Sequence, residues 1–201
     1  MAPDQRAAGR QRDPRTDAAA VQAVLDLVAA GATLSGLSLV TIAEHAGVSR
    51  NSLYRRWKTK DELYLDVLDS INRPLPDCAG PTARDDLTAH LAILFERSLD
   101  PRAGRMLRAL LAEAAAFPVL QRRYFDEVVA PRRAAMFAIL ERGIAAGEFR
   151  PDLDLTMVNE VLVGPALARM GSGFAAGLDP HEASAQIVGL VCDGIRAAQP
   201  G

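Results

Sequence analysis

The chain has 201 residues, of which 49% are hydrophobic, and a formal net charge of −2. This composition can supply a substantial core, and the length allows one large or two small domains. No apolar run is long enough to span a membrane, and the N-terminal residues lack the apolar stretch of a signal peptide. We therefore expect a cytoplasmic protein.

The cysteines and histidines do not form a metal-binding or disulfide pattern. Cys78 and Cys192 lie far apart, and the three histidines have no metal-ligand spacing. We therefore expect no metal, no cofactor and no catalytic cysteine.

The N-terminal region is expected to be a tail followed by a helix. Residues 1–15 carry several arginines and no apolar periodicity, which predicts a disordered tail. Residues 16–30 carry Val21, Val24 and Val28 at helical spacing. This pattern predicts the first helix.

Residues 38–63 predict two short helices joined by a tight turn. Ser38 is a good N-cap for a helix that carries Leu39 and Ile42, and Gly47 can end that helix in a left-handed conformation. Ser49 then caps a second helix that ends near Trp57. This second helix begins a stretch without acidic residues, whose basic residues are Arg50, Arg55, Arg56, Lys58 and Lys60. A basic patch on an otherwise acidic chain is typical of an oriented nucleic-acid surface.

The rest of the chain predicts further helices and no strands, so the fold class is all-α. A helix from 59 or 60 to about 72 is followed by a linker at 73–81 that holds three prolines. The later helices are expected at 82–99, 101–117, 118–146, 154–176 and 180–198. Pro131 lies inside the third of these and should kink or split it.

The two short helices resemble the helix-turn-helix of the TetR family of bacterial transcriptional regulators. The matching positions, without a gap, are Ser38, Leu39, Ile42, Ala43, Ala46, Gly47, Val48, Ser49, Leu53, Tyr54, Trp57, Lys60 and Leu63. Ser38, Leu39 and Trp57 stand where the family usually has Thr, Val and Phe, and each keeps the chemistry of its position. The resemblance implies a DNA-binding domain at 16–72 and a ligand-binding and dimerisation domain at 82–201. It also implies a homodimer formed through the last two long helices.

The resemblance and side-chain chemistry together suggest which residues meet DNA. Arg50, Asn51 and Ser52 lie in the first turn of the second short helix, where family members reach base edges in the major groove. Arg55 is a second candidate base reader. Thr41, Tyr54 and Lys60 are expected at phosphates. A dimer with one such motif in each subunit is expected to read a palindromic operator.

Family members are mostly repressors that a small molecule releases from DNA. The resemblance therefore implies a pocket, and its mainly apolar candidates suggest a largely apolar ligand. The candidate lining residues are Tyr64, Leu107, Leu111, Phe117, Tyr124, Phe125, Met136, Phe137, Asn159 and Leu162.

Two alternatives remain open at this stage. In the first, the C-terminal domain only dimerises or binds a protein partner. In the second, the chain is an all-helical enzyme with Glu113 and Glu160 as carboxylates. No nucleophile–base pair, metal set or phosphate-binding glycine loop supports catalysis, so we expect no enzyme.

Overall fold

The computed structural model describes residues 14–72, 74–76, 80–172 and 177–195, and no β-strand occurs among them. The elements in chain order are α1 (Pro14–Ala29), α2 (Leu39–Ala46), α3 (Arg50–Arg56), α4 (Lys60–Ile71), α5 (Ala83–Leu99), α6 (Pro101–Ala112), α7 (Pro118–Tyr124), the π-helical turn η1 (Phe125–Val129), α8 (Ala130–Ala145), α9 (Leu155–Ser172) and α10 (Pro180–Ile195). The all-α prediction is confirmed. Residues 1–13 of the predicted tail and Cys78 lie outside the described residues.

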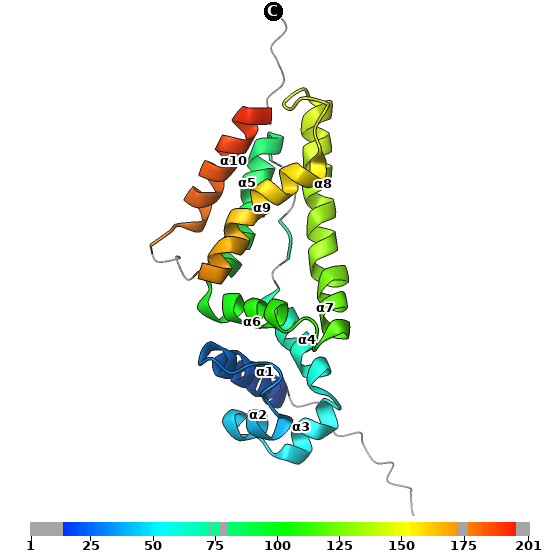
Figure 1. Ribbon diagram of the computed structural model, residues 1–201, viewed down its shortest axis with the longest axis vertical. Helices are drawn as coiled ribbons and strands as arrows, with labels where there is room; N and C mark the ends of the chain where they lie inside the picture. The colour runs from blue at the N-terminus through cyan, green and yellow to red at the C-terminus, as the bar shows by residue number, and fades with distance from the viewer. Residues whose placement is uncertain (1–13, 73, 77–79, 173–176, 196–201) are drawn as a thin grey trace, which may run out of the picture.

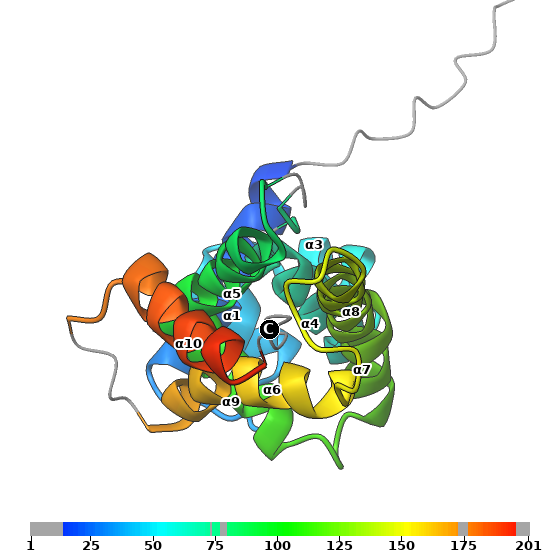
Figure 2. The same cartoon turned by 90° about the horizontal axis from the view of Figure 1, so that it is seen from above.

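The helices form a small lower group and a larger upper group (Figure 1). Helices α1, α2 and α3 gather at the lower end, and α4 leads from them toward the upper group. Helix α6 lies across the junction, while α5, α8, α9 and α10 form the upper group, which Figure 2 shows from above. Within the described ranges, no helix combines the length and apolarity needed to cross a membrane.

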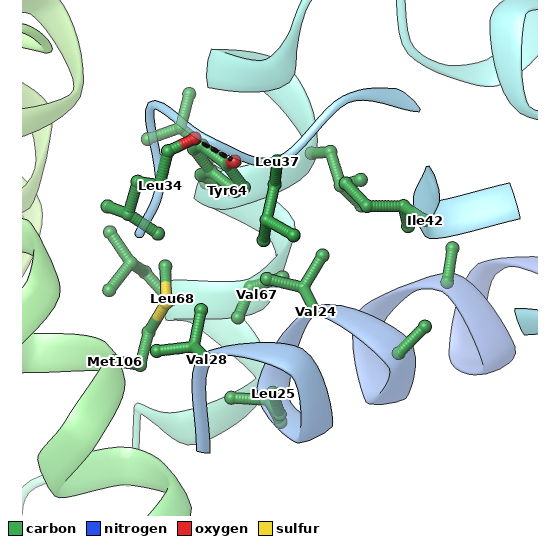
Figure 3. Close-up of a cluster of buried hydrophobic side chains, with 14 of the residues drawn as sticks. Val24, Leu25, Val28, Leu34, Leu37, Ile42, Tyr64, Val67, Leu68 and Met106 are labelled. Carbon is green, nitrogen blue, oxygen red and sulfur yellow. Dashed lines mark hydrogen bonds between the residues drawn. The ribbon is translucent and has the colours of Figure 1, made fainter. Parts of the chain in front are cut away.

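The lower core contains residues from both sides of the predicted linker at 73–81. Val24, Ile42 and Leu68 come from the helices before the linker (Figure 3), and all three are almost fully buried. Met106 and Leu110 of α6 belong to the same cluster. The linker divides the sequence, but α6 completes the core of the lower helices. The two helical groups are therefore joined by packed side chains.

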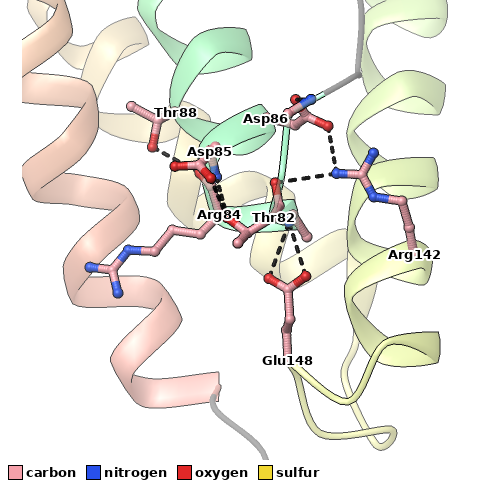
Figure 4. Close-up of polar contacts among 9 residues, drawn as sticks. Thr82, Arg84, Asp85, Asp86, Thr88, Arg142 and Glu148 are labelled. Atoms are coloured by element: carbon pink, nitrogen blue, oxygen red, sulfur yellow. Dashed lines mark hydrogen bonds and ion pairs between the residues drawn. The ribbon is translucent and has the colours of Figure 1, made fainter.

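The upper core forms around α5, whose first turn is held by polar contacts (Figure 4). The carboxylate of Glu148 accepts from the backbone N–H of Ala83, with both oxygens at 3.1 Å. Arg142 pairs with Asp86, which is 4% exposed. These contacts fix the direction of α5, one wall of the cavity described below.

Two predicted boundaries differ from the structure. The tail was expected to run to residue 15, but α1 already begins at Pro14. Helix α6 was expected to run to about Phe117 but ends at Ala112. The chain turns at 113–116, which lets the side chain of Glu113 reach the α1–α2 loop. The predicted ends at 176 and 198 lie outside the described residues.

The long helix expected at 118–146 changes its hydrogen-bond spacing just before Pro131. The segment is divided into α7, the π-helical turn η1 and α8, and Pro131 occupies the first turn of α8. Proline has no N–H for the preceding turn, and a π turn changes the hydrogen-bond spacing just before it. The sequence predicted a kink or a split at Pro131, and the segment instead stays helical through the π turn.

Candidate DNA-binding surface and ligand cavity

Side-chain caps set the geometry of α2 and α3. The Ser38 hydroxyl accepts from Thr41 N at 3.0 Å, and the Ser49 hydroxyl accepts from Ser52 N at 3.0 Å. Gly47 ends α2 with φ +65°, a left-handed conformation that a side chain would strain. The turn between the two helices therefore follows directly from local sequence.

One face of α3 is anchored to the rest of the lower group. Leu53 and Trp57 are almost fully buried, and Trp57 Nε1 donates to Asp66 Oδ2 at 2.8 Å. Arg56 Nε donates to Asp17 Oδ2 at 2.9 Å. Arg56 is therefore tied to α1 and fixes the orientation of α3.

The opposite face of α3 exposes most of the predicted DNA contacts. Asn51 and Arg55 are exposed, and Tyr54 is 46% exposed. Arg50 is also exposed but forms an ion pair with Glu44 of α2. An exposed pair of this kind stabilises by only about 0.2–1 kcal/mol, so the guanidinium can exchange partners at small cost.

The hydroxyls of Thr41 and Ser52 lie beside the two capping serines. Thr41 Oγ1 is 2.8 Å from Ser38 Oγ, and Ser52 Oγ accepts from Ser49 Oγ at 2.8 Å. Thr41 is exposed and Ser52 is half-buried. Both residues lie at the helix starts, where a backbone phosphate can also be bound.

Lys60 has an internal role in this structure. Its ammonium donates to the carbonyls of Leu34, Ser35 and Leu37 at 3.1, 3.0 and 2.8 Å. An ammonium has three N–H donors, so these bonds use all of them. The predicted phosphate contact of Lys60 would require it to give up at least one of these bonds.

The Glu113 carboxylate accepts hydrogen bonds from backbone N–H groups of the same loop. It accepts from Leu34 N at 2.6 Å and from Ser35 N at 2.8 Å. Burial acts to raise the pKa of Glu113, but the hydrogen bonds from Ser35 and Leu34 and the charge of Lys60 together leave that pKa below its ordinary value. The carboxylate is therefore ionised near neutral pH. Because Glu113 follows directly on α6, it connects this helix to the α1–α2 loop.

Two aromatic residues predicted at the pocket lie instead in the lower core. Tyr64 is fully buried, and its hydroxyl donates to Leu34 O at 2.7 Å (Figure 3). Burial raises the pKa of Tyr64, so the hydroxyl stays a donor. The Phe117 ring packs edge-on against Tyr64 with centroids 5.6 Å apart. The hydrogen bond and the ring contact fill the space between α4 and α6, which keeps both residues out of the cavity wall.

A cavity of about 680 Å³ lies between helices of the upper group and the helices at the junction, with walls from α5, α6, α7, η1, α8 and α9. This volume is within the range of small-molecule sites. Six of the residues expected at a pocket line it: Leu107, Leu111, Tyr124, Phe125, Met136 and Asn159. Leu162 and Phe137 do not line it. Leu162 is fully buried in the upper core, and Phe137 stacks beneath the guanidinium of Arg133.

Several charged and polar lining residues were missed in the sequence. They are His90 and Arg97 of α5, Gln121 and Arg122 of α7, Arg132 and Arg133 of α8, and Glu160 of α9. His90, Leu94 and Arg97 share the i, i+4, i+7 spacing of one helix face. Because polar residues are unusual on a buried helix face, His90 and Arg97 beside Leu94 could have predicted a polar cavity wall on α5.

The outer face of α9 and α10 exposes large apolar side chains. Met157 and Val161 of α9 are 56% and 49% exposed, and Leu190 of α10 is 79% exposed. These three residues, here called the α9–α10 face, line one shallow groove together with Gly194. Exposed apolar side chains therefore gather on this side of the molecule.

The paired α2 and α3, with the exposed polar and basic face of α3, define a helix-turn-helix DNA-binding protein. Comparison with known proteins agrees with this class. Residues 34–67 match the family described as bacterial regulatory proteins, tetR family, and residues 79–190 match the tetracyclin repressor-like C-terminal domain. The chain belongs to the TetR family and is a DNA-binding transcriptional regulator.

Individual relatives show the extent of the similarity. An uncharacterised HTH-type transcriptional regulator of Bacillus subtilis, YdeS, is 30% identical over 168 residues, 81% of each chain. The transcriptional repressor KstR2 of Mycolicibacterium smegmatis is 27% identical over 179 residues, covering 79% of this chain and 77% of its own. A TetR-family regulator from Rhodococcus sp. has the same fold, with a TM-score of 0.72 and 22% identity over 91% of this chain and 99% of its own.

Proposed function

We propose that the protein is a homodimeric repressor that binds a palindromic operator and leaves it when a small molecule enters the cavity. The observation that carries this proposal is the position of α6. Leu107 and Leu111 of α6 line the cavity, and Glu113, directly after the same helix, binds the loop that leads into α2. A ligand that moves α6 therefore acts on the DNA-binding helices through a direct contact.

We infer that the exposed face of α3 reads the operator. Arg50 and Arg55 can bond guanine bidentately, and Asn51 can do the same with adenine. Each such contact contributes about 1–3 kcal/mol of discrimination between bases. Ser52 lies beside Arg50 and Asn51 in the first turn of α3, at the base edges. The hydroxyls of Thr41 and Tyr54 and the basic residues around them supply phosphate contacts, which add affinity without sequence preference.

We assign dimerisation to the α9–α10 face. Its exposed apolar side chains support this assignment, since they would otherwise remain in water. Gly164 and Gly194 also support it, because a Cβ placed at either position would meet no atom within 4 Å, so these surfaces can approach a partner closely. Two α3 helices related by a twofold axis then reach two half-sites.

The release mechanism is a shift between two states of the dimer. In one state the spacing of the two α3 helices fits the operator, and in the other it does not. A ligand lowers operator affinity only if it binds the second state more tightly than the first. The contacts of Glu113 and Lys60 with the α1–α2 loop are the elements that would transmit this preference. The cavity favours this reading over a C-terminal domain that only dimerises, because a dimeriser needs no ligand-sized space.

The first test is selection of binding sequences from random duplex DNA with the purified protein. We expect an enriched inverted repeat, bound by two subunits, with affinity that falls as salt rises. Enrichment of a single half-site would remove the dimer from the proposal. General, salt-sensitive binding without any enriched sequence would overturn base reading by α3. The selected operator then serves as the probe for release by candidate ligands.

A further inference from the structure

Arg97 is a buried cation in the cavity wall. It is 3% exposed and lines the cavity from α5. Its Nε and Nη2 are buried and have no hydrogen-bond partner among the residues that the structure describes. A guanidinium keeps its charge under all ordinary conditions, and burying a charge without a partner is costly. The position therefore calls for a negatively charged partner.

A second guanidinium faces the same region and increases this demand. Burial and the nearby charge of Arg97 lower the pKa of Arg132 on α8. Arg132 Nη2 donates to Asn72 Oδ1 at 2.9 Å, and its side chain lines the cavity. Two cations that repel each other across a partly buried space are both stabilised by one anion placed between them.

His90 adds a neutral donor to the same wall. It lies two turns before Arg97 on α5, about 10 Å along the helix axis, and both of its ring nitrogens are buried without a partner among the described residues. Burial and the charge of Arg132 lower the pKa of His90, while Asp86 acts in the other direction. The imidazole is therefore neutral near pH 7 and can donate one N–H to a ligand oxygen.

The charge balance of the whole wall points the same way. Four arginines line the cavity, and Glu160, which is exposed, is the one acidic residue among the described lining residues. Most of the remaining surface is apolar and comes from Leu91, Leu94, Leu107, Met136 and Val163. The cavity thus combines an apolar body with a cationic wall.

We propose that the cavity binds an apolar molecule with one anionic head group, a carboxylate or a phosphate, and that Arg97 and Arg132 bind this head. The inference rests on the proposed effector role of the cavity and names the chemical class of the effector. The sequence suggested a largely apolar ligand, and the buried guanidinium of Arg97 indicates that this ligand also carries a negative charge. Neutral apolar molecules would leave Arg97 without a countercharge.

The test uses ten-carbon compounds that share one apolar chain and differ in the head: decanoate, decyl phosphate, 1-decanol and decylammonium. Binding to the full chain is measured by titration calorimetry. We expect an anion to bind about ten- to hundredfold more tightly than 1-decanol, the range of charge-assisted hydrogen bonds, and decylammonium to bind most weakly. The ratio between decanoate and decyl phosphate distinguishes a carboxylate ligand from a phosphate ligand. Equal affinities of the anions and 1-decanol, or no binding of any compound, would overturn the proposal.

Variants identify the residue that recognises the head group. Arg97→Gln should remove the preference for the anion over 1-decanol, whereas Arg123→Gln, the same change at an exposed arginine of α7 that does not line the cavity, should preserve it. If Arg97→Gln does not fold, Arg132→Gln at a half-buried position carries the test, with an expected severalfold loss of the preference. An unchanged preference in a folded Arg97→Gln protein would overturn the assignment of the head group.

Operator release is measured separately from ligand binding. Tight binding of the anion without loss of operator affinity would keep the anionic site and reject the effector role. Release of the operator by 1-decanol as effectively as by the anions would keep the effector role and reject the anionic site.

Discussion

Lys60 and Glu113 bind the same backbone segment through its opposite polar groups. The Lys60 ammonium takes three carbonyl oxygens between Leu34 and Leu37, and the Glu113 carboxylate takes two N–H groups at the start of that segment. One residue begins α4 and the other follows α6. The α1–α2 loop is therefore held between the DNA-binding helices and the cavity wall.

Replacing Glu113 by Gln should destabilise the protein by about 1–3 kcal/mol. The single amide oxygen of Gln cannot accept both hydrogen bonds that the two carboxylate oxygens accept from Leu34 N and Ser35 N. Urea unfolding of both proteins measures the difference. Glu141→Gln at an exposed position of α8 is the matched control and should change little. Equal effects of the two substitutions would show that the Glu113 contact contributes nothing specific.

The Glu113 contribution should also depend on pH. The pKa of Glu113 in the folded protein lies below its ordinary value of 4.5. The stabilisation is therefore present above that ordinary value and is lost as the pH falls through the folded pKa. The stability difference between the native chain and Glu113→Gln should shrink over this range, and a constant difference would count against an ionised Glu113.

Asn51→Ala should lower discrimination at one operator position by about 1–3 kcal/mol, since it removes one base-reading side chain. Tyr54→Phe should weaken binding to all sequences alike, because phosphates are the same in every sequence. Affinities for the operator and for single-base variants of it distinguish the two effects. If Asn51→Ala lowers the affinity for all of these sequences equally, Asn51 contacts the DNA backbone and does not read a base.

Glu44→Gln should strengthen operator binding severalfold at low salt. The substitution removes a negative charge beside α3 and frees Arg50 from its ion pair. The gain should decline as salt rises, because both residues of the pair are exposed. In a protein that also carries Arg50→Ala, Glu44→Gln should give little of this gain in operator affinity. A full gain in the double variant would show that it does not come from freeing Arg50.

Leu190→Glu should convert the dimer to monomers and weaken operator binding, because it places a charge in the α9–α10 face. Sedimentation velocity and operator titration measure both effects. Val119→Glu is the control, since Val119 of α7 is also exposed, at 61%, but lies away from this face. Dimers that survive Leu190→Glu would assign the interface to another surface.

Gly143→Ala should destabilise the upper group by about 1–3 kcal/mol through overpacking. A Cβ at this position of α8 would lie 2.3 Å from the Phe149 ring and 2.9 Å from Ala83 Cβ. Gly189→Ala on α10 is the control, because there the methyl would meet only the flexible end of Arg84 at 3.0 Å. Thermal melting compares them, and Phe149→Leu should partly rescue Gly143→Ala.

The sequence by itself determined the local features of this protein. The caps at Ser38 and Ser49, the left-handed turn at Gly47 and the buried spacing of Leu53 and Trp57 depend on neighbouring residues, so they could be predicted without the fold. The all-α class and most helix starts follow for the same reason, because caps and periodicity act within a few turns.

Only the tertiary structure decided which side chains meet across the chain. Tyr64 and Phe117 looked like pocket residues, yet they pack in the lower core because α6 crosses the junction between the two helical groups. Lys60 reaches a loop about 25 residues earlier, and Glu113 reaches the same loop from 78 residues away. Arg97 becomes a candidate ligand site because the neighbouring helices bury its Nε and Nη2 without a partner among the residues that the structure describes. Burial and pairing are properties of packed helices, and periodicity along one helix does not specify the partner that its face will meet.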